Sequence, residues 1–476
     1  MRKKLIIAVI FAIFLSTRLI GLGNDISNSD SGRWHRRSEK FLEALKQKDL
    51  KSTYQRYHPG VTLMWINSIV KQVAFKYQLT YTQNPKTLEN ADYFPLIHGV
   101  SKGVNVLVLA VLLGIQMFFV SKLFGREESL VYGFMISLEP YVVGINRWFH
   151  LSSFEVFFGF TSLLCLLYWR KNQGGKFLVF ASLLYSLSVL SKMSSLILLP
   201  VFICVFMSTK KWKDFCYFTL LTCMFVFLLF PALYVDPFYV FNKIFNALQG
   251  AISTDIRGSM ISIYLRPFYY LVILGFKLSP ITLILSILAL FSLVKNPKFT
   301  TKIVLMSLII NYVFLSASDQ RIDRYSLVFI LPLLLLVSVF LVKHAQKWLM
   351  GVITVYFLLV AYAYHPVYSA YYSPLFGGTK GAINSGLYDN SGEYFAQAAA
   401  YLNNKGRDVN TYVPNGYESF SYFYKGNAQR EFSNETKYVI RSYDMSRSSV
   451  VETVCSDLEK SFGPANFPIV YIYKCD

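Results

Sequence analysis

The sequence predicts an α-helical polytopic membrane protein that ends in a small α/β domain. Of its 476 residues, 54% are hydrophobic and only 16% are charged, whereas about a quarter of the residues in soluble domains are charged. Several apolar runs approach the roughly 20 residues that an α-helix needs to cross a bilayer. From about residue 382 the composition changes to Asn, Ser, Gly, Tyr and Glu, which is typical of a soluble domain.

The formal net charge of +20 does not indicate a nucleic-acid-binding protein. The basic residues lie in short loops between apolar runs and do not gather in one segment. Such a distribution is typical of the cytoplasmic loops of membrane proteins. We therefore expect membrane lipid, and not nucleic acid, around this chain.

The first element is an apolar run over residues 5–22 that follows a basic start. A secretory signal peptide is the alternative, but no small-x-small cleavage site follows the run. We expect a first transmembrane helix with a cytoplasmic N-terminus and a first exterior loop over residues 23–99. Within this loop, residues 57–77 contain a Pro-Gly pair and two lysines, which favours an amphipathic segment at the interface over a span.

Ten further apolar runs bring the expected number of spans to about eleven. They cover residues 100–120, 129–145, 150–169, 176–191, 194–208, 215–234, 268–294, 303–317, 325–342 and 348–364. Alternate threading places every short basic loop on one side, which must then be the cytoplasm of a multi-pass protein of the cell (plasma) membrane. The His, Asp, Arg, Pro and aromatic residues collect in the exterior loops, so we expect the chemistry there.

The chain divides into a transmembrane module over residues 1–380 and an extracytoplasmic domain over residues 381–476. In the latter, apolar positions recur at helical spacing in 391–404, and residues 411–413 and 469–473 have the composition of short strands. Cys455 and Cys475 fall on the oxidising side in this threading. A disulfide and a pair of buried free thiols are both open.

Asp30, in the first exterior loop, is the candidate general base. A carboxylate just past a helix end at the membrane surface can accept the proton of an acceptor hydroxyl. The alternative is that Asp25 and Asp30 only solvate the loop.

A second cluster flanks the turn between the third and fourth spans: Glu139, Arg147, His150 and Glu155. Ionisable groups at membrane depth are costly and tend to line cavities or to pair internally. The cluster therefore predicts either a site or an Arg147–Glu155 ion pair that only positions the helix.

Three more cationic residues lie on the predicted exterior side: Lys192, Arg321 and Arg324. Ammonium and guanidinium groups suit the phosphate of a lipid-linked substrate. The alternatives are a snorkelling Lys192 and local ion pairs of the arginines with Asp319 and Asp323. No Walker, CxxC, HExxH or GxSxG motif occurs, so nothing supports nucleotide hydrolysis or a serine nucleophile.

In this order, these motifs resemble the polytopic GT-C glycosyltransferases that use polyprenyl-phosphate sugars, and most of all the bacterial relatives of the protein O-mannosyltransferases. The resemblance covers nearly the whole chain and rests on six short segments. They are Asp30 to Ser38 with Tyr57-His58-Pro59-Gly60-Val61, Glu139-Pro140 with Asn146 to His150, Leu190-Ser191-Lys192, Pro231 to Pro237, Asp323-Arg324-Tyr325, and Tyr371 to Gly378. The sequence departs from the family at Ser31 and Ser152, where acidic residues are usual, and this puts a metal site in doubt.

The resemblance implies an inverting glycosyltransferase of the hexosyl or pentosyl class. Its donor would be a polyprenyl-phosphate sugar and its acceptor a hydroxyl on a protein, a glycolipid or a glycan. Asp30 would be the catalytic base, with Glu139 or Glu155 as a second acid and a divalent cation as an open cofactor. The substrate and its phosphate would be bound by a polar set: His58, Arg147, His150, Lys192, Arg321 and Arg324. A transporter or flippase of a lipid-linked saccharide, and a non-catalytic membrane scaffold, remain the alternative functions.

Overall fold

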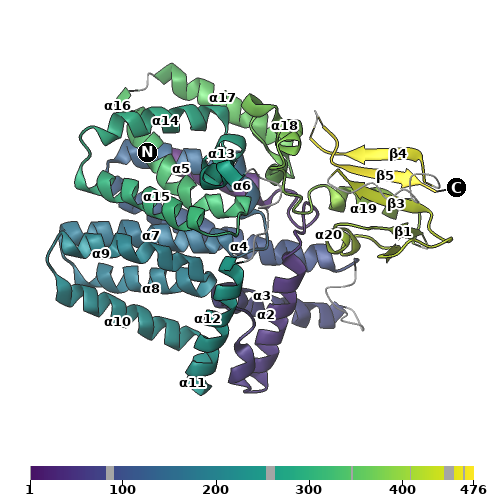
Figure 1. Ribbon diagram of the computed structural model, residues 1–476, viewed down its shortest axis with the longest axis horizontal. Helices are drawn as coiled ribbons and strands as arrows, with labels where there is room; N and C mark the ends of the chain where they lie inside the picture. Colours follow the sequence, from purple (N-terminus) through teal and green to yellow (C-terminus); the bar gives the residue numbers. More distant parts are fainter. Residues whose placement is uncertain are drawn as a thin grey trace.

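The computed structural model of the protein describes residues 2–81, 91–253, 263–344, 347–407, 409–443, 455–464 and 467–475. A large helical module lies beside a small five-stranded sheet domain (Figure 1). The predicted fold class, a helical polytopic membrane protein with a C-terminal α/β domain, is confirmed.

The helical module contains seventeen α-helices among the described residues. They are α1 (Arg2–Leu19), α2 (Ser31–Lys46), α3 (Val61–Tyr81), α4 (Phe94–Leu123), α5 (Arg126–Leu138), α6 (Pro140–Asn146), α7 (Ser152–Asn172), α8 (Gly175–Ser191), α9 (Leu199–Met207), α10 (Trp212–Leu229), α11 (Ala232–Val235), α12 (Pro237–Ser253), α13 (Tyr269–Lys277), α14 (Pro280–Val294), α15 (Phe299–Ala317), α16 (Leu327–His344) and α17 (Lys347–Tyr364). Short 3₁₀ turns join some of them: η1 (Leu50–Thr53), η2 (Met193–Leu198), η3 (Ile263–Phe268) and η4 (Asp323–Ser326).

Five helices of the described part are long and apolar enough to cross a membrane. They are Phe94–Leu123, Ser152–Asn172, Trp212–Leu229, Phe299–Ala317 and the continuous η4–α16 segment Asp323–His344. Of the apolar window, 94% is buried in α7 but only 11% in α10. Helix α7 is therefore the centre of the module, whereas α10 presents its apolar side chains outward, as a lipid-facing helix does.

Several of the expected spans are interrupted, and two of the breaks lie directly before a proline that begins the next helix. The run over residues 129–145 breaks at Glu139-Pro140 into α5 and α6, and the run over 268–294 breaks before Pro280 into α13 and α14. Proline supplies the first turn of each following helix because it needs no N–H partner there. Each break brings polar backbone and side chains to the end of the bundle.

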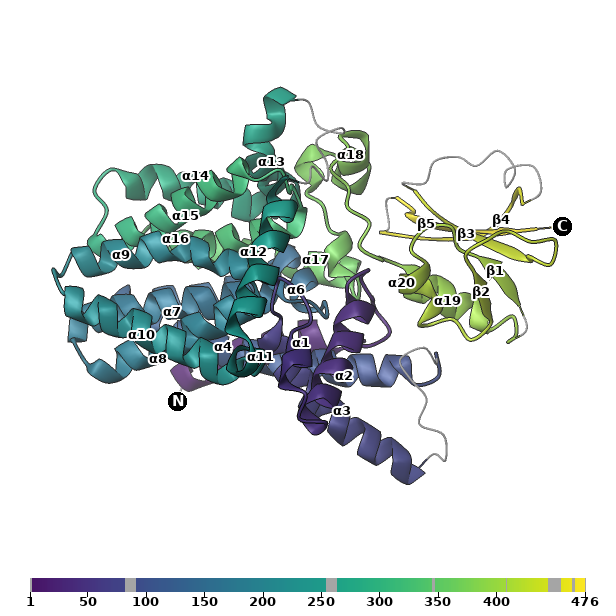
Figure 2. The ribbon, with the colours of Figure 1, turned by 60° about the horizontal axis from the view of Figure 1, so that its bottom comes forward.

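Helices α2 and α12 run crosswise to the bundle helices in both views (Figures 1 and 2). On α12, Val240 and Ile244 are buried in a cluster that includes Phe41 of α2, while Phe238 and Phe241 lie on the exposed side. This helix thus closes one side of the region around α2 and η1.

The C-terminal sheet has the strand order β2-β1-β3-β5-β4. The strands are β1 (Asn410–Tyr412), β2 (Asn427–Gln429), β3 (Tyr438–Ser442), β4 (Asp457–Phe462) and β5 (Val470–Lys474). Strand β1 is parallel to β2 and β3, and β5 is antiparallel to β3 and β4. The predicted helix is present as α19 (Phe395–Asn403), the two predicted strands are β1 and β5, and Cys455 and Cys475 form a disulfide.

The sheet domain docks onto the first loop of the helical module. The Arg36 guanidinium donates a 2.6 Å hydrogen bond to the Tyr422 hydroxyl, and the ring of Tyr422 stacks on Phe94. A Cβ atom at Gly32 would lie 2.2 Å from the Tyr422 oxygen, so only glycine permits this approach. The Gln397 amide donates to the main-chain oxygen of Asp25. The domain therefore holds the start of α2, directly after Asp30.

Candidate active site

A turn positions Asp30 so that its carboxylate does not cap helix α2. The Asn28 side chain accepts hydrogen bonds from the Asp30 N–H at 3.1 Å and from the Ser31 hydroxyl at 2.9 Å. An Asn that binds backbone two residues on stabilises such a turn. Asp30 is the N-cap residue of α2 but makes no side-chain capping hydrogen bond, so its carboxylate is available for partners across the loop.

Three side chains surround this carboxylate. Arg324 Nη2 lies 3.1 Å from Asp30 Oδ2, His150 Nε2 lies 3.5 Å from the same oxygen, and Arg33 Nη1 lies 3.6 Å from Oδ1. The Asp30 side chain is still 22% exposed. It is thus an ionised, positioned acceptor that a substrate can reach.

Ser152 determines which nitrogen of His150 carries the proton. The Ser152 N–H lies 3.2 Å from His150 Nδ1 and its hydroxyl lies at 3.0 Å. Because Nδ1 accepts from a backbone N–H, the proton of a neutral imidazole must be on Nε2, which faces Asp30. The residue at which the sequence departs from the resembled family therefore orients His150.

Asp30 lines a polar cavity of about 180 Å³. Five cationic side chains line it as well: Arg33, Arg37, Arg56, Lys192 and Arg324. Among the lining residues that the structure describes, which also include His58 and His150, Asp30 is the only carboxylate. Such an excess of fixed positive charge in a concave site favours an anionic ligand.

A second, mainly apolar cavity of about 340 Å³ adjoins the polar one. The two share five lining residues: Tyr57, His58, Lys192, Gln320 and Tyr325. Leu248 of α12 and Phe314 and Leu315 of α15 supply part of its apolar lining. A ligand with an anionic head and a hydrocarbon tail has complementary surfaces in the two cavities.

Lys192 lies at the boundary between them because the chain leaves helical conformation there. It is the C-cap of α8, with extended backbone angles, and η2 follows. Its Nζ lies 3.2 Å from Glu155 Oε2 and 3.7 Å from the centre of the Tyr325 ring. Glu155 also accepts a hydrogen bond from Ser194. Lys192 is therefore held by an ion pair and a cation–π contact, and is not a snorkelling lysine.

Arg324 is fixed through its neighbour. Asp323 pairs with Lys277 at 3.1 Å, and its main-chain oxygen accepts from the Tyr141 hydroxyl at 2.8 Å. Lys277 in turn lies 3.7 Å from the centre of the Tyr372 ring. Asp323 thus has two buried partners in place of the surface ion pair with Arg324 that was the alternative, while Arg324 pairs with Asp30.

The surroundings set the protonation of the loop residues in this cavity. Burial alone would raise the pKa of Asp30, but His150, Arg324 and Arg33 hold it well below its ordinary value. Burial lowers the pKa of His150 to about 4 and that of His58 well below its usual range. Since His150 is then neutral at pH 7, its contribution to Asp30 is a hydrogen bond, and Arg324 supplies the permanent charge.

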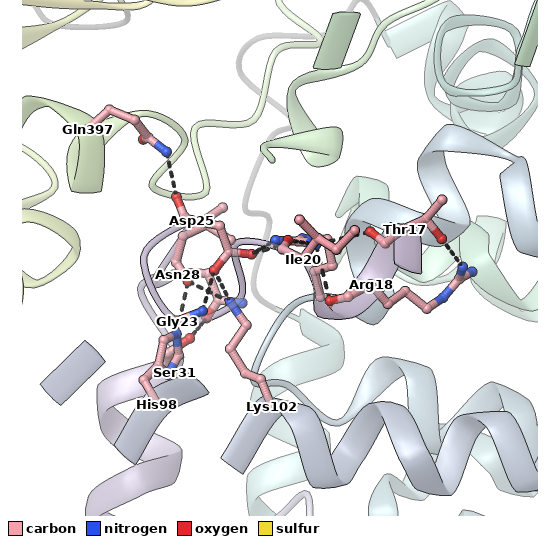
Figure 3. Close-up of polar contacts among 12 residues, drawn as sticks. Thr17, Arg18, Ile20, Gly23, Asp25, Asn28, Ser31, His98, Lys102 and Gln397 are labelled. Atoms are coloured by element: carbon pink, nitrogen blue, oxygen red, sulfur yellow. Dashed lines mark hydrogen bonds and ion pairs between the residues drawn. The ribbon is translucent and has the colours of Figure 1, made fainter. Parts of the chain in front are cut away.

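Arg147 does not line this cavity, contrary to the prediction. Its Nε lies 2.9 Å from Asp25 Oδ2, and its Nη1 donates to three main-chain oxygens at the end of α1. Lys102 Nζ lies 2.6 Å from the other Asp25 oxygen, as Figure 3 shows. Asp25, Lys102 and Arg147 are all buried. Arg147 therefore pairs with Asp25 and not with Glu155, and Asp25 is not a solvating loop residue.

Glu139 and Arg321 also lie outside the lining of the polar cavity. Glu139 accepts hydrogen bonds from Ser279 and Thr282 at the N-terminus of α14, where a carboxylate is favoured by the helix dipole. Arg321 Nη1 lies 3.4 Å from Asp319 Oδ1, so the local ion pair expected as its alternative is formed. Of the two candidate second acids, only Glu155 is close to the cavity, through Lys192.

Several lining residues were not among the predicted site residues. Arg33 and Arg37 follow Asp30 by three and seven positions, so one face of α2 carries all three toward the cavity. This helical spacing predicts that both arginines lie on the same face of α2 as Asp30. Gln320 and Tyr325, in contrast, are joined by a 3.2 Å hydrogen bond that no spacing indicates.

Among the residues that the structure describes, no group of three or more His, Cys, Asp or Glu side chains is arranged to hold a metal ion. Asp30 and His150, whose side chains are 3.5 Å apart, lie among the cations that line the polar cavity.

Comparison with known proteins gives no match to any family model or to any curated protein sequence. Two solved structures share the fold. ArnT from Cupriavidus metallidurans in the apo state superposes with a TM-score of 0.51 at 12% identity, covering 98% of this chain and 97% of ArnT. ArnT bound to undecaprenyl phosphate gives a TM-score of 0.50 at 13% identity, covering 88% and 74%. At these identities the likeness establishes the fold.

Proposed function

We propose that this polytopic membrane protein, which has the fold of the GT-C glycosyltransferases, transfers a sugar from a polyprenyl-phosphate donor to an acceptor hydroxyl on the exterior face of the membrane. The N-terminus would be cytoplasmic and the sheet domain extracytoplasmic, as the distribution of basic loops indicates. One observation carries the proposal: a cation-lined cavity with one carboxylate shares a wall with an apolar cavity.

Lys192 in the shared wall and Arg324 in the polar cavity would bind the donor phosphate. Lys192 borders both cavities, and Arg324 lies in the polar one. Charge-assisted hydrogen bonds to phosphate are about twice as strong as neutral ones. The apolar cavity would take the first isoprene units of the carrier. A structure of the same fold, that of ArnT, contains undecaprenyl phosphate, which supports this class of lipid.

Asp30 would act on the acceptor. In an inverting transfer, the acceptor oxygen attacks the anomeric carbon while its proton passes to the Asp30 carboxylate. The bond between the anomeric carbon and the phosphate oxygen breaks, and polyprenyl phosphate leaves with the bonding electron pair. A positioned base typically contributes about 10²–10⁴-fold to such a step.

The Arg324 guanidinium would couple donor binding to the basicity of Asp30. Together with His150, it keeps the pKa of Asp30 low, which would make that carboxylate a weak base. A donor phosphate would take over part of the Arg324 charge and let the pKa of Asp30 rise toward its ordinary value. Donor binding would thus prepare the base, and the fixed cations would stabilise the charge that develops on the leaving phosphate.

Release of free polyprenyl phosphate tests this function. Purified full-length protein in detergent is incubated with undecaprenyl-phosphate hexose and pentose donors, and the undecaprenyl phosphate formed is measured. A transferase releases it from at least one donor, and Asp30→Asn suppresses the release. A transporter or a scaffold leaves every donor intact, and that result would refute the proposal.

A further inference from the structure

A third cavity, of about 490 Å³, lies between the C-terminal half of α2, the η1 turn and the start of α12. Its lining is polar with two aromatic rings, and includes Lys40, Glu43, Gln47, Asp49, Tyr54 and Tyr239. None of these residues lines the polar or the apolar cavity described above. We call this third cavity the α2–α12 cleft.

Two tyrosine rings form a fixed corner in the α2–α12 cleft. The rings of Tyr54 and Tyr239 are 6.0 Å apart and inclined by 77°, and Phe230 stacks on Tyr54 from behind. Asp236 accepts a hydrogen bond from the Tyr239 N–H and pairs with Lys51 at 3.1 Å. Lys51 Nζ also lies 4.4 Å from the centre of the Tyr239 ring. These contacts hold the aromatic surface in place before any ligand arrives.

The charge of the α2–α12 cleft differs from that of the polar cavity. Lys40 and Lys51 are matched by Glu43 and Asp49, whereas the polar cavity has five cations against Asp30. A cleft with balanced charge does not select an anion such as phosphate. Carboxylate, amide and ammonium groups beside an aromatic ring suit a neutral polyhydroxyl ligand. Its hydroxyls would exchange hydrogen bonds with the polar groups, and its C–H face would pack on the ring.

The two cavities lie on either side of one short segment. Tyr54 and Gln55 line the α2–α12 cleft, while Arg56, Tyr57 and His58 line the polar cavity. Four residues of chain advance by at most about 14 Å. The linings of the two cavities therefore approach each other within the length of a short oligosaccharide, and the polar one contains Asp30.

We propose that the α2–α12 cleft binds a neutral saccharide unit of the acceptor, next to the unit whose hydroxyl receives the sugar. This assignment rests on the proposed transferase function and narrows its acceptor to a glycan or glycolipid. Tyr239 is the stacking platform, and Glu43 accepts hydrogen bonds from the saccharide hydroxyls.

Saturation-transfer NMR on the purified full-length protein tests the assignment without a donor. The probes are mannotriose, maltotriose and triacetylchitotriose. We expect at least one to bind, and Tyr239→Ala to weaken it about tenfold by removing the stacking surface. Glu43→Gln should weaken it severalfold. Phe241→Ala is the matched control, because this ring is on the same helix but 61% exposed and outside the cleft lining. The trisaccharide affinity of Phe241→Ala should equal that of the wild type.

Three results would overturn the assignment: no binding of any trisaccharide, equal binding by Tyr239→Ala, or displacement of the trisaccharide by glycerophosphoethanolamine. The last would make the cleft a site for a zwitterionic lipid headgroup. The outcome is separable from that of the transferase proposal. Asp30→Asn should keep trisaccharide binding, whereas release of undecaprenyl phosphate without trisaccharide binding would refute only the cleft.

Discussion

Replacing Asp30 with asparagine isolates proton acceptance from the other contacts of this side chain. The amide keeps the shape of the carboxylate, and its oxygen can still accept from Arg324, which lies 3.1 Å from Asp30. What it loses is the ability to take a proton. Turnover should fall by about 10²–10⁴-fold, which corresponds to about 2.7–5.4 kcal/mol of activation free energy. Undecaprenyl phosphate release under single-turnover conditions measures this loss.

Donor binding should not weaken in Asp30→Asn, since the substitution removes a negative charge from a cation-lined cavity. The matched control is Asp319→Asn, because Asp319 is 49% exposed and lies near the cavity without lining it. This control should turn over at the wild-type rate. Equal and small losses from both substitutions would show that Asp30 is not the base. The assignment would then move to Glu155, which pairs with Lys192 of the cavity lining.

Four further substitutions, a pH profile and one fusion test the remaining parts of the site. Asp25→Asn leaves Lys102 and its partner arginine buried without a counter-charge, so it should lower stability by about 3–5 kcal/mol, seen as a lower unfolding temperature in detergent. Lys192→Met should weaken both stability and donor binding, and adding Glu155→Gln should restore the unfolding temperature but not the donor affinity. Because the pKa of Asp30 is depressed, its ionised form should persist as pH falls, and wild-type kcat/KM should show no loss from this group down to about pH 5. Arg324→Gln should raise that pKa and move the acid limb of the profile to higher pH; an unmoved limb would contradict the assigned role of this arginine. A reporter active only in the cytoplasm, fused to the C-terminus, should be silent, and activity there would overturn the proposed orientation.

The polar cavity was predictable in outline because its residues interrupt apolar runs. Asp30, His150, Lys192 and Arg324 each follow or precede a hydrophobic segment, and alternate threading places those ends on one side. These four side chains then converge because charged groups at the ends of packed helices share the small polar volume that is available there.

The direction of individual side chains was not predictable in the same way. Arg147 is three residues from His150, which suggests a shared face, but α6 ends at Asn146 and the intervening turn points the two side chains apart. The Arg147–Glu155 pair, one of the two alternatives for this cluster, is not formed because Arg147 pairs with Asp25 and Glu155 with Lys192. Spacing describes a regular helix and carries no information on which buried charges meet across a chain reversal.

No local sequence pattern predicts the α2–α12 cleft. Its aromatic corner joins Tyr54 to Tyr239, and its ion pair joins Lys51 to Asp236 across 185 positions. Each residue alone is an ordinary loop or interface residue. Only the crosswise packing of α12 over α2 and η1 brings them together.

The hydrogen bonds between the sheet domain and the first loop have a consequence for the timing of biosynthesis. Arg36 and Tyr422 are 386 positions apart, and Asp25 and Gln397 are 372 apart. At ribosomal rates of about 5–20 residues per second, these partners emerge about 20–75 s after the loop that they hold. For most of its synthesis, the nascent chain therefore contains Asp30 without the sheet-domain contacts that hold its loop in place. A chain interrupted before Gln397 and Tyr422 lacks these contacts, so the loop that carries Asp30 is held in place only late in synthesis.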